Sequence, residues 1–339
     1  MWFIGDIALN GLISSQSEKN HERFEEAATF FKNKHFVFAN LETPVFIENS
    51  QNSRKKIVHT TNKEALKVLK DLNVFGVSLA NNHIFDCTEK GVESTIEWLQ
   101  MNNIKYTGAG FSQKDLEPIV FDDNEGNRIA FFAYVDENTN PHCSNNNSFY
   151  INFLDLEQIK NDLSRYRDSC AKLIVSLHWG IDYSRYVSQN QLEIAEEIID
   201  AGADLIIGHH SHVIQPFKSY KGKKIFFGIG GLVFGDYYTN KGLESTFKKT
   251  KKGLVIHYEN EKFSFYKSKD KKGNKISIED YQEYETLGEK WFLKNLWIME
   301  RKNYFAIYQK FQLSIMKIYH FFFAYQNNPI NRLKHKIFK

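Results

Sequence analysis

The sequence predicts a layered α/β domain over about its first 260 residues. Short apolar runs alternate there with amphipathic stretches, which is the pattern of a sheet with helices packed on it. Polar residues recur directly after the apolar runs, and 42% of the 339 residues are hydrophobic, which is enough for a large core. These observations exclude a disordered chain and favour one large α/β domain with an appendage.

The expected strands are apolar and end in polar residues or glycine. They span 2–6, 35–44, 74–83, 104–110, 128–135, 171–180, 203–212 and 224–231. The expected helices have apolar residues at helical spacing and lie between these strands. They span 21–34, 62–73, 91–103 and 190–202. In open α/β sheets, ligands bind outside the carboxyl ends of the strands, so the polar strand ends are the candidate site.

The stretch GVSLANNHIFD, residues 76–86, shows the pattern most clearly. Its first half suits a buried strand, but the strand ends in Asn81, Asn82 and His83, with Asp86 three residues further on. The other polar side chains that directly follow apolar strands are Asp6, Glu42, His178, His210 and His212. We therefore expect these metal-competent side chains to converge on one edge of the sheet.

Each of these residues also has an ordinary interpretation. A lone Asp or Glu after a strand is often a turn residue or a helix cap, and His178 alone suits a core as well as a metal. Three imidazoles within 209–212 are harder to place, because a buried strand end offers few partners for them. Carboxylates, an amide and imidazoles without a thiolate suit two divalent metal ions, namely Mn²⁺, Fe or Zn²⁺.

Six motifs in order resemble the CapA-type proteins of poly-γ-glutamate capsule synthesis, a branch of the calcineurin-like metallophosphoesterase superfamily. They are GD at 5–6, NLETPV at 40–45, SLANNHIFD at 78–86, NIKYTGAG at 103–110, SLHWGIDY at 176–183 and IGHHSHVIQP at 207–216. The resemblance implies a four-layer α/β/β/α sandwich over residues 1–258. A basic, aromatic and mainly helical extension is expected over 259–339.

The resemblance also implies a role for each site residue. Asp6 and His212 would bind the first metal, and Glu42 would bridge the two metals. The second metal would be completed by Asn82, His178 and His210. The catalytic pair would be His83, which faces the leaving group, and Asp86, which orients the His83 ring. Two neighbours are set aside here: Asn81 suits the turn, and His209 falls outside the His-x-His-Val pattern of the family.

The chain departs from the wider pattern at two positions. The superfamily often has a histidine two residues after the first aspartate, whereas this chain has Ala8. The CapA-type proteins that it resembles also lack this histidine. An asparagine is expected where this chain has Gly231, and Asp236 is a candidate to replace it. The first metal is therefore expected to be held more weakly.

Two functions follow from these residues. The first is a metal-dependent, phosphoesterase-like hydrolase that acts on an anionic polymer or a phosphoester in capsule or surface-polymer biosynthesis. The second keeps the fold and the metals in a polymer-handling component without turnover. The intact residues Asn82, His83 and Asp86 favour the hydrolase, whereas Ala8 and Gly231 favour the second function.

The remaining features bear on location. Cys87, Cys143 and Cys170 are widely spaced, which argues against a disulfide framework and a zinc ribbon and predicts ordinary thiols in a reducing compartment. No export signal precedes Gly5, and no run of about 18 apolar residues is present. We expect a cytoplasmic protein, with peripheral contact at the inner membrane face as a further expectation from the tail.

The tail is strongly basic and aromatic. Residues 290–339 contain ten Lys or Arg, one acid and thirteen aromatic residues, so this segment has a net charge of +9. Because the whole chain has a net charge of +3, the remaining residues have a net charge of −6 (3 minus 9). It suits a helical extension packed on the domain or an amphipathic segment on anionic lipid. Nucleic-acid binding is not expected, because no binding module accompanies the charge.

We predict that the full chain sediments with anionic liposomes at low salt, because each basic residue near an anionic surface adds about 1 kcal/mol. A version that ends near residue 285 should remain in the supernatant and keep its metals. Raising the salt should release the full chain. A truncation that unfolds the domain, together with no lipid binding, would instead make the tail structural.

Overall fold

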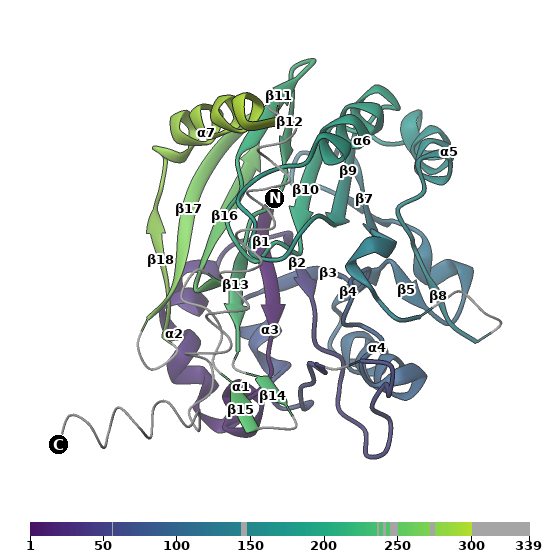
Figure 1. Cartoon of the computed structure of the whole chain (residues 1–339), viewed down its shortest axis with the longest axis vertical. Helices are drawn as coiled ribbons and strands as arrows, with labels where there is room; N and C mark the ends of the chain where they lie inside the picture. The colour runs from purple at the N-terminus through teal and green to yellow at the C-terminus, as the bar shows by residue number, and fades with distance from the viewer. Residues whose placement is uncertain are drawn as a thin grey trace.

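The chain folds as two sheets packed face to face, with helices on both outer faces (Figure 1). This computed structural model describes residues 1–55, 57–143, 148–235, 237–239, 242–244, 250–271 and 275–299. Three hydrophobic clusters fill the space between the helices and the first sheet, between the two sheets, and between the second sheet and its helices. The predicted four-layer α/β/β/α sandwich is therefore confirmed.

The first sheet has the order β18–β17–β16–β1–β2–β3–β4, with β13 also paired to β1. Its strands are β1 (Trp2–Ala8), β2 (Val37–Leu41), β3 (Val74–Ser78), β4 (Lys105–Thr107), β13 (Gly231–Phe234), β16 (Lys252–Glu259), β17 (Lys262–Lys271) and β18 (Lys275–Asp280). Neighbours among β1 to β4 are parallel, so their carboxyl ends share one edge.

The second sheet has the order β11–β12–β10–β9–β7–β6. Its strands are β6 (Ile119–Asp122), β7 (Arg128–Val135), β9 (Lys172–His178), β10 (Leu205–His209), β11 (Phe217–Tyr220) and β12 (Lys223–Phe226). The central pairs β7–β9, β9–β10 and β10–β12 are parallel. Two short pairs join β5 (Ala109–Gly110) to β8 (Tyr150–Ile151) and β14 (Tyr237–Thr239) to β15 (Gly242–Glu244).

The helices cover both outer faces. Those on the side of the first sheet are α1 (Leu12–Ser15), α2 (Asn20–Phe31), α3 (Lys67–Asp71) and α4 (Thr88–Met101). The second sheet is covered by α5 (Leu156–Arg167) and α6 (Gln189–Asp200). Short 3-10 turns lie at Ser17–Lys19, Gln113–Leu116 and Glu137–Thr139. The helix expected over 62–73 is shorter than predicted, because only Lys67–Asp71 is helical.

Alternation along the strands separates the layers. Phe3 and Phe38 enter the cluster between the sheets, whereas Ile4 and Ala39, one residue later, face the helices. The rings of Phe38 and Phe131 stack across the two sheets with centroids 4.5 Å apart. Such buried aromatic pairs add about 0.5–1.5 kcal/mol beyond area burial and fix how the sheets face each other.

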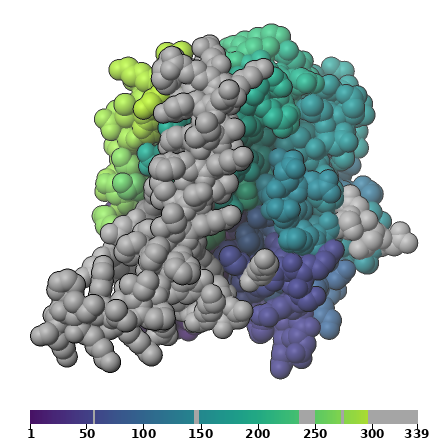
Figure 2. Space-filling model, viewed as in Figure 1, coloured from purple at the N-terminus to yellow at the C-terminus, as the bar shows by residue number. Residues whose placement is uncertain are grey.

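The chain after residue 258 differs from the expected helical extension. Residues Lys262–Lys271 and Lys275–Asp280 are strands that continue the first sheet, so the expected boundary falls at a hairpin between two paired strands. The cause is a strand-like alternation: Leu254, Ile256 and Phe265 all enter the cluster between the sheets. Figure 1 shows β16, β17 and β18 side by side in the first sheet, and Figure 2 shows the same view with all atoms drawn.

Among the described residues after 258, α7 (Tyr284–Met299) is the only helix, and it is packed on the domain. Tyr284 is fully buried, and its ring lies 5.6 Å from that of Phe217 in β11. A truncation meant to test lipid binding should therefore end after Met299 rather than near residue 285. Within the described ranges no helix is long and apolar enough to cross a bilayer. Residues 300–339, which contain most of the basic tail, lie outside the described residues.

Asp204, directly before β10, links the starts of β9 and β12, the two strands that flank β10, to the end of α5. Its carboxylate is 8% exposed, accepts a hydrogen bond from the Leu173 amide at 2.9 Å, and pairs with Arg167 at 2.7 Å and Lys223 at 2.6 Å. Burial alone would raise the pKa of Asp204, but the hydrogen bonds from Arg167 and Lys223 lower it below its ordinary value.

We predict that Asp204→Asn lowers the free energy of unfolding by about 1–3 kcal/mol at pH 7, the usual range for hydrogen bonds to a charged group. Because the folded-state pKa is depressed, this contribution is full above the unfolded pKa of about 4 and is lost as the pH falls through the folded value. Urea unfolding of both proteins at pH 7 and at several pH values below about 4 measures the difference and its loss. Asp200→Asn, which removes an exposed pair with Lys221, should change stability by less than about 1 kcal/mol. An Asp204→Asn effect no larger than that would contradict the prediction.

Candidate metal centre

The carboxyl ends of both sheets meet at one buried polar cluster. Asp6 lies in β1, Glu42 directly follows β2, His178 ends β9, and His210 and His212 follow β10. These five residues are at most 3% exposed. The structure thus brings together side chains that are up to 206 residues apart in the sequence.

Asn40 is the hydrogen-bonding centre of this cluster. Its Nδ2 donates to Asp6 Oδ1 at 2.9 Å and Glu42 Oε1 at 3.1 Å, and lies 3.1 Å from His178 Nδ1. Sequence analysis missed this residue. The signal was present, because alternation along β2 places Asn40 on the same face as Glu42, two residues later.

The two asparagines after β3 have different surroundings. Asn81 Nδ2 donates to the Leu41 carbonyl at 2.8 Å, and its Oδ1 accepts from the His83 amide at 3.1 Å, which is the turn role expected from the sequence. Asn82 Oδ1 lies 2.9 Å from His178 Nε2. Asn82 therefore presents its amide oxygen to the cluster, where a metal ligand was expected.

The histidine-rich loop after β10 contributes three imidazoles. His209 and His212 both bind Asp6, through Oδ1 and Oδ2 respectively, each at 2.9 Å, and His210 Nδ1 lies 3.1 Å from His178 Nε2. Sequence analysis set His209 aside, but it lies in the cluster. His210 and His212 have φ values of 83° and 53°. This left-handed backbone costs on the order of 1–3 kcal/mol in a non-glycine residue, and such strain gathers at functional sites.

The electrostatics of the cluster favour a cation. Burial raises the pKa of Glu42, and the neighbouring charge of Asp6 raises it further. Burial alone would raise the pKa of Asp6 as well, but hydrogen bonds from His209 and His212 hold it well below its ordinary value. Burial opposes protonation of His212, yet Glu42 and Asp6 raise its pKa to about 9. Two carboxylates confined in a buried space are stabilised by positive charge.

The residues fit a pair of divalent ions. Glu42 Oε2 is buried and accepts no hydrogen bond within the described ranges. The candidate ligand atoms form two groups, each within 4.8 Å: Asp6, Glu42 and His178, and Asp182, His210 and His212. Burial lowers the pKa of His178 and of His210, which favours the neutral imidazole that a metal requires. Both groups differ from the expected arrangement, because Asp6 lies with His178 rather than with His212, and His210 lies with His212. Asp182 had no assigned role.

The expected catalytic pair is adjacent to this cluster. His83 Nδ1 lies 2.8 Å from Asp86 Oδ2, and Lys55 forms an ion pair with Asp86 Oδ1 at 2.7 Å. The amide of His59 donates to Asp86 Oδ2 at 2.7 Å, and the His59 ring lies 4.2 Å from that of His83. Burial and the charge of Lys55 both lower the pKa of His83. Lys55 and His59 come from the loop after β2, which has no periodic pattern to reveal them.

The glycines near Asp6 explain one motif and one departure. A Cβ on Gly5 would lie 1.9 Å from the Gly230 carbonyl oxygen. The GD motif at 5–6 therefore needs its glycine, because the backbone just before β13 lies against it. Gly231 pairs with Asp6, and a Cβ there would make only ordinary contacts, the nearest at 3.6 Å. The backbone at position 231 therefore leaves space for a Cβ atom, and no close approach requires glycine there. Asp236, the candidate replacement, lies outside the described residues.

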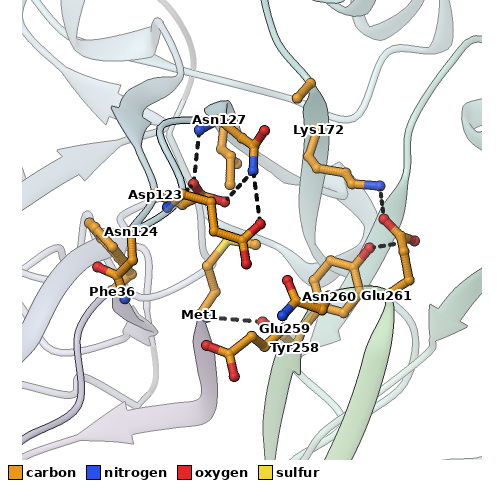
Figure 3. A pocket seen from close by; sticks show the side chains of 13 residues that line it. Met1, Phe36, Asp123, Asn124, Asn127, Lys172, Tyr258, Glu259, Asn260 and Glu261 are labelled. Atoms are coloured by element: carbon orange, nitrogen blue, oxygen red, sulfur yellow. Dashed lines mark hydrogen bonds and ion pairs between the residues drawn. The ribbon is translucent and has the colours of Figure 1, made fainter.

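A separate cavity of about 320 Å³ lies at the opposite ends of the strands (Figure 3). Met1, Lys172 and the turns at 123–127 and 259–261 line it. Two of its acidic side chains are already bound, because Asp123 accepts from Asn127, and Glu261 contacts Lys172 and Tyr258. The cavity therefore offers no counterpart to the cluster at the carboxyl ends.

Comparisons with known proteins place these residues in context. A family model described as bacterial capsule synthesis protein PGA_cap matches residues 1–236. The PGA biosynthesis protein CapA of Bacillus subtilis (strain 168) is 30% identical over 241 residues, which are 70% of this chain and 63% of that protein. The capsule biosynthesis protein CapA of Bacillus anthracis is 31% identical over 246 residues, 69% of this chain and 57% of that protein.

The chain thus spans less than two thirds of the length of these curated relatives. Among solved structures, the calcineurin-like phosphoesterase YfkN from Bacillus subtilis is 13% identical and has a TM-score of 0.40. That match covers 88% of this chain and 98% of the solved chain.

We predict that Mn²⁺ raises the thermal midpoint of the full chain, because an ion bound only to the folded state stabilises it, by about 2.7 kcal/mol at 100 times Kd. Glu42→Gln should leave the metal-free midpoint nearly unchanged and abolish most of the Mn²⁺ shift. Asp162→Asn, a change in an acidic residue that binds Tyr134, is the matched control and should keep the full shift. Elemental analysis should find about two ions per chain in the wild type; equal Mn²⁺ shifts in all three proteins would refute the assignment of Glu42.

Proposed function

The chain belongs to the PGA_cap family of bacterial capsule synthesis proteins, and from this premise we propose that it is a metal-dependent, phosphoesterase-like hydrolase of surface-polymer biosynthesis. The observation that supports the proposal is a buried cluster of carboxylates and imidazoles next to a hydrogen-bonded His83–Asp86 pair. The cluster would hold the ions, and the pair would handle a proton.

The metal ions would polarise an oxygen of the scissile group and lower the pKa of a bound water. Asp6, Glu42, Asn82, His178, His210 and His212 would hold them. Asn40 holds Asp6 and Glu42 in place through its hydrogen bonds, so the ligands are oriented before any ion binds.

His83 would transfer a proton to the leaving oxygen. Its Nδ1 faces Asp86, so Nε2 is the nitrogen left for the substrate. Asp86 fixes the ring orientation and is itself held by Lys55 and the His59 amide. The His83 side chain is only 12% exposed, so bulk water has little access to the proton transfer.

The proposed substrate is an anionic polymer, poly-γ-glutamate or a polysaccharide, or a phosphoester formed during its synthesis. The names of the two CapA relatives support this class, and both relatives are longer than this chain. We also propose a cytoplasmic location, with peripheral lipid contact through the basic tail and no nucleic-acid partner.

A polymer-handling component without turnover is the second candidate. Ala8 and Gly231 favour it, because each removes a polar side chain expected near the first metal. Measuring metal content and hydrolysis of bis(p-nitrophenyl) phosphate and a γ-glutamyl amide in parallel separates the two candidates. Bound metal without turnover of either compound would support the second candidate.

We predict that His83→Ala lowers turnover of the phosphodiester roughly 10²- to 10⁴-fold, the usual contribution of a positioned acid or base. Its metal content should stay near that of the wild type. Asn82→Ala and His178→Ala should instead lower metal content, measured by elemental analysis. His21→Ala, which changes an exposed histidine, is the control for both measurements. Equal metal loss in the three site variants would make His83 a ligand.

A further inference from the structure

The loop after β9 brings an additional carboxylate to the cluster. We propose that Asp182, on this loop, is a ligand of the ion that His212 binds, and that it supplies a side-chain donor where Ala8 supplies none. This inference rests on the proposed metal centre and adds a residue to it. No motif role was assigned to Asp182, although it lies within SLHWGIDY.

The distances match a shared ion rather than a hydrogen bond. Asp182 Oδ1 lies 3.7 Å from Nε2 of His210 and 3.7 Å from Nε2 of His212. Hydrogen bonds between nitrogen and oxygen are about 2.7–3.2 Å long, so both contacts are too long. Two atoms that each bind the same ion at about 2.0–2.2 Å lie roughly 3–4 Å apart.

The orientation of His212 points to the same conclusion. Its Nδ1 lies 2.9 Å from Asp6 Oδ2, so its Nε2 faces the other way, toward Asp182 and, at 3.9 Å, Glu42 Oε2. An imidazole whose Nδ1 hydrogen is donated to a carboxylate offers a lone pair at Nε2. Two carboxylate oxygens and this nitrogen then surround one position, which suits a cation that displaces the proton from Nε2.

The loop holds Asp182 in this position. The Tyr183 amide donates to the Ser211 carbonyl at 2.8 Å, which ties the loop to the histidine-rich loop. Gly180 has a φ of 87°, which favours glycine, and a Cβ there would lie 2.6 Å from the Gln191 amide nitrogen. Further along, Asn295 of α7 binds both the amide and the carbonyl of Val187, at 2.9 and 3.1 Å.

The carboxylate oxygens of Asp182 are available to bind an ion. Its side chain is 49% exposed and makes no hydrogen bond with the described residues. Asp136 is another acidic residue whose charge reaches His210, but its Oδ1 caps a turn by accepting from the Asn138 amide at 2.9 Å. The carboxylate of Asp182 is therefore the one aimed at the two imidazoles. Its exposure places the first metal at the solvent side of the cluster.

The ligand count supports this role. With Ala8 in place of a histidine, the first metal would have Asp6, Glu42 and His212 as protein ligands. Resident ions of this type commonly have four ligands, and open positions are filled by water or substrate. Asp182 would restore the fourth protein ligand and add negative charge.

The test measures Mn²⁺ binding to the full chain by titration calorimetry. Asp182→Ala and Asp136→Asn are the matched pair of variants. We expect about two ions in the wild type and in Asp136→Asn. In Asp182→Ala we expect one ion to bind as in the wild type, while the other is lost or weakened by at least the roughly 10- to 100-fold that loss of an outer-shell partner costs. Asp182→Glu, which keeps the carboxylate, should retain the second ion.

Loading with Co²⁺ gives a readout that does not depend on activity. Its visible absorption responds to ligand number and geometry, so removal of Asp182 should change the band, whereas Asp136→Asn should not. The metal-free thermal midpoints should agree, because Asp182 is half exposed. Two ions of wild-type affinity and an unchanged Co²⁺ band in Asp182→Ala would overturn the role proposed for Asp182 and leave the proposed metal centre intact. A wild type that binds no ion would overturn the proposed metal centre with it.

Discussion

The confinement of two carboxylates, Asp6 and Glu42, at the ends of neighbouring parallel strands is the constraint on which the rest of the site depends. Both side chains are fully buried, and each lies within hydrogen-bond reach of the same Asn40 amide. Burying one carboxylate is costly unless it is paired, and burying two beside each other adds their repulsion. The surrounding imidazoles, the Asn40 donor and the tight Gly5 crossing compensate for that cost. A sheet built only for stability would have apolar residues at these positions.

Most of the sandwich could be predicted from the sequence, because strands and helices have clear periods in this chain. The polar strand ends predicted where the candidate site lies, since parallel strands deliver their carboxyl ends to one edge. Asn40 could have been found by the same alternation that identifies Glu42. Asp182 and Lys55 could not, because both lie on irregular loops whose course is set by distant hydrogen bonds, such as that from Tyr183 to Ser211.

The C-terminal region was misjudged for a different reason. A shift toward basic and aromatic residues suggested a boundary near residue 258, but composition reports what a segment can contact and not whether it pairs with a sheet. Leu254 and Ile256 alternate into the core between the sheets, and Phe265 of the next strand joins them. Asn295 then links α7 to the loop that contains Asp182. The described part of the segment first interpreted as an appendage therefore extends the sheet and holds the loop that carries Asp182.

The site also joins the two sheets. Asp6 belongs to the first sheet, and the imidazoles that bind it, those of His209 and His212, come from the second. An ion held by Glu42 and His212 would add a bond between the same two sheets. Metal binding should therefore stabilise the packing of the whole sandwich and not only the loops around the ion. Conversely, a change that shifts the sheets, such as loss of the Phe38–Phe131 stacking, would move the ligands apart. In this fold the core between the sheets sets the geometry of the candidate metal centre, and an ion bound there would in turn stabilise the core.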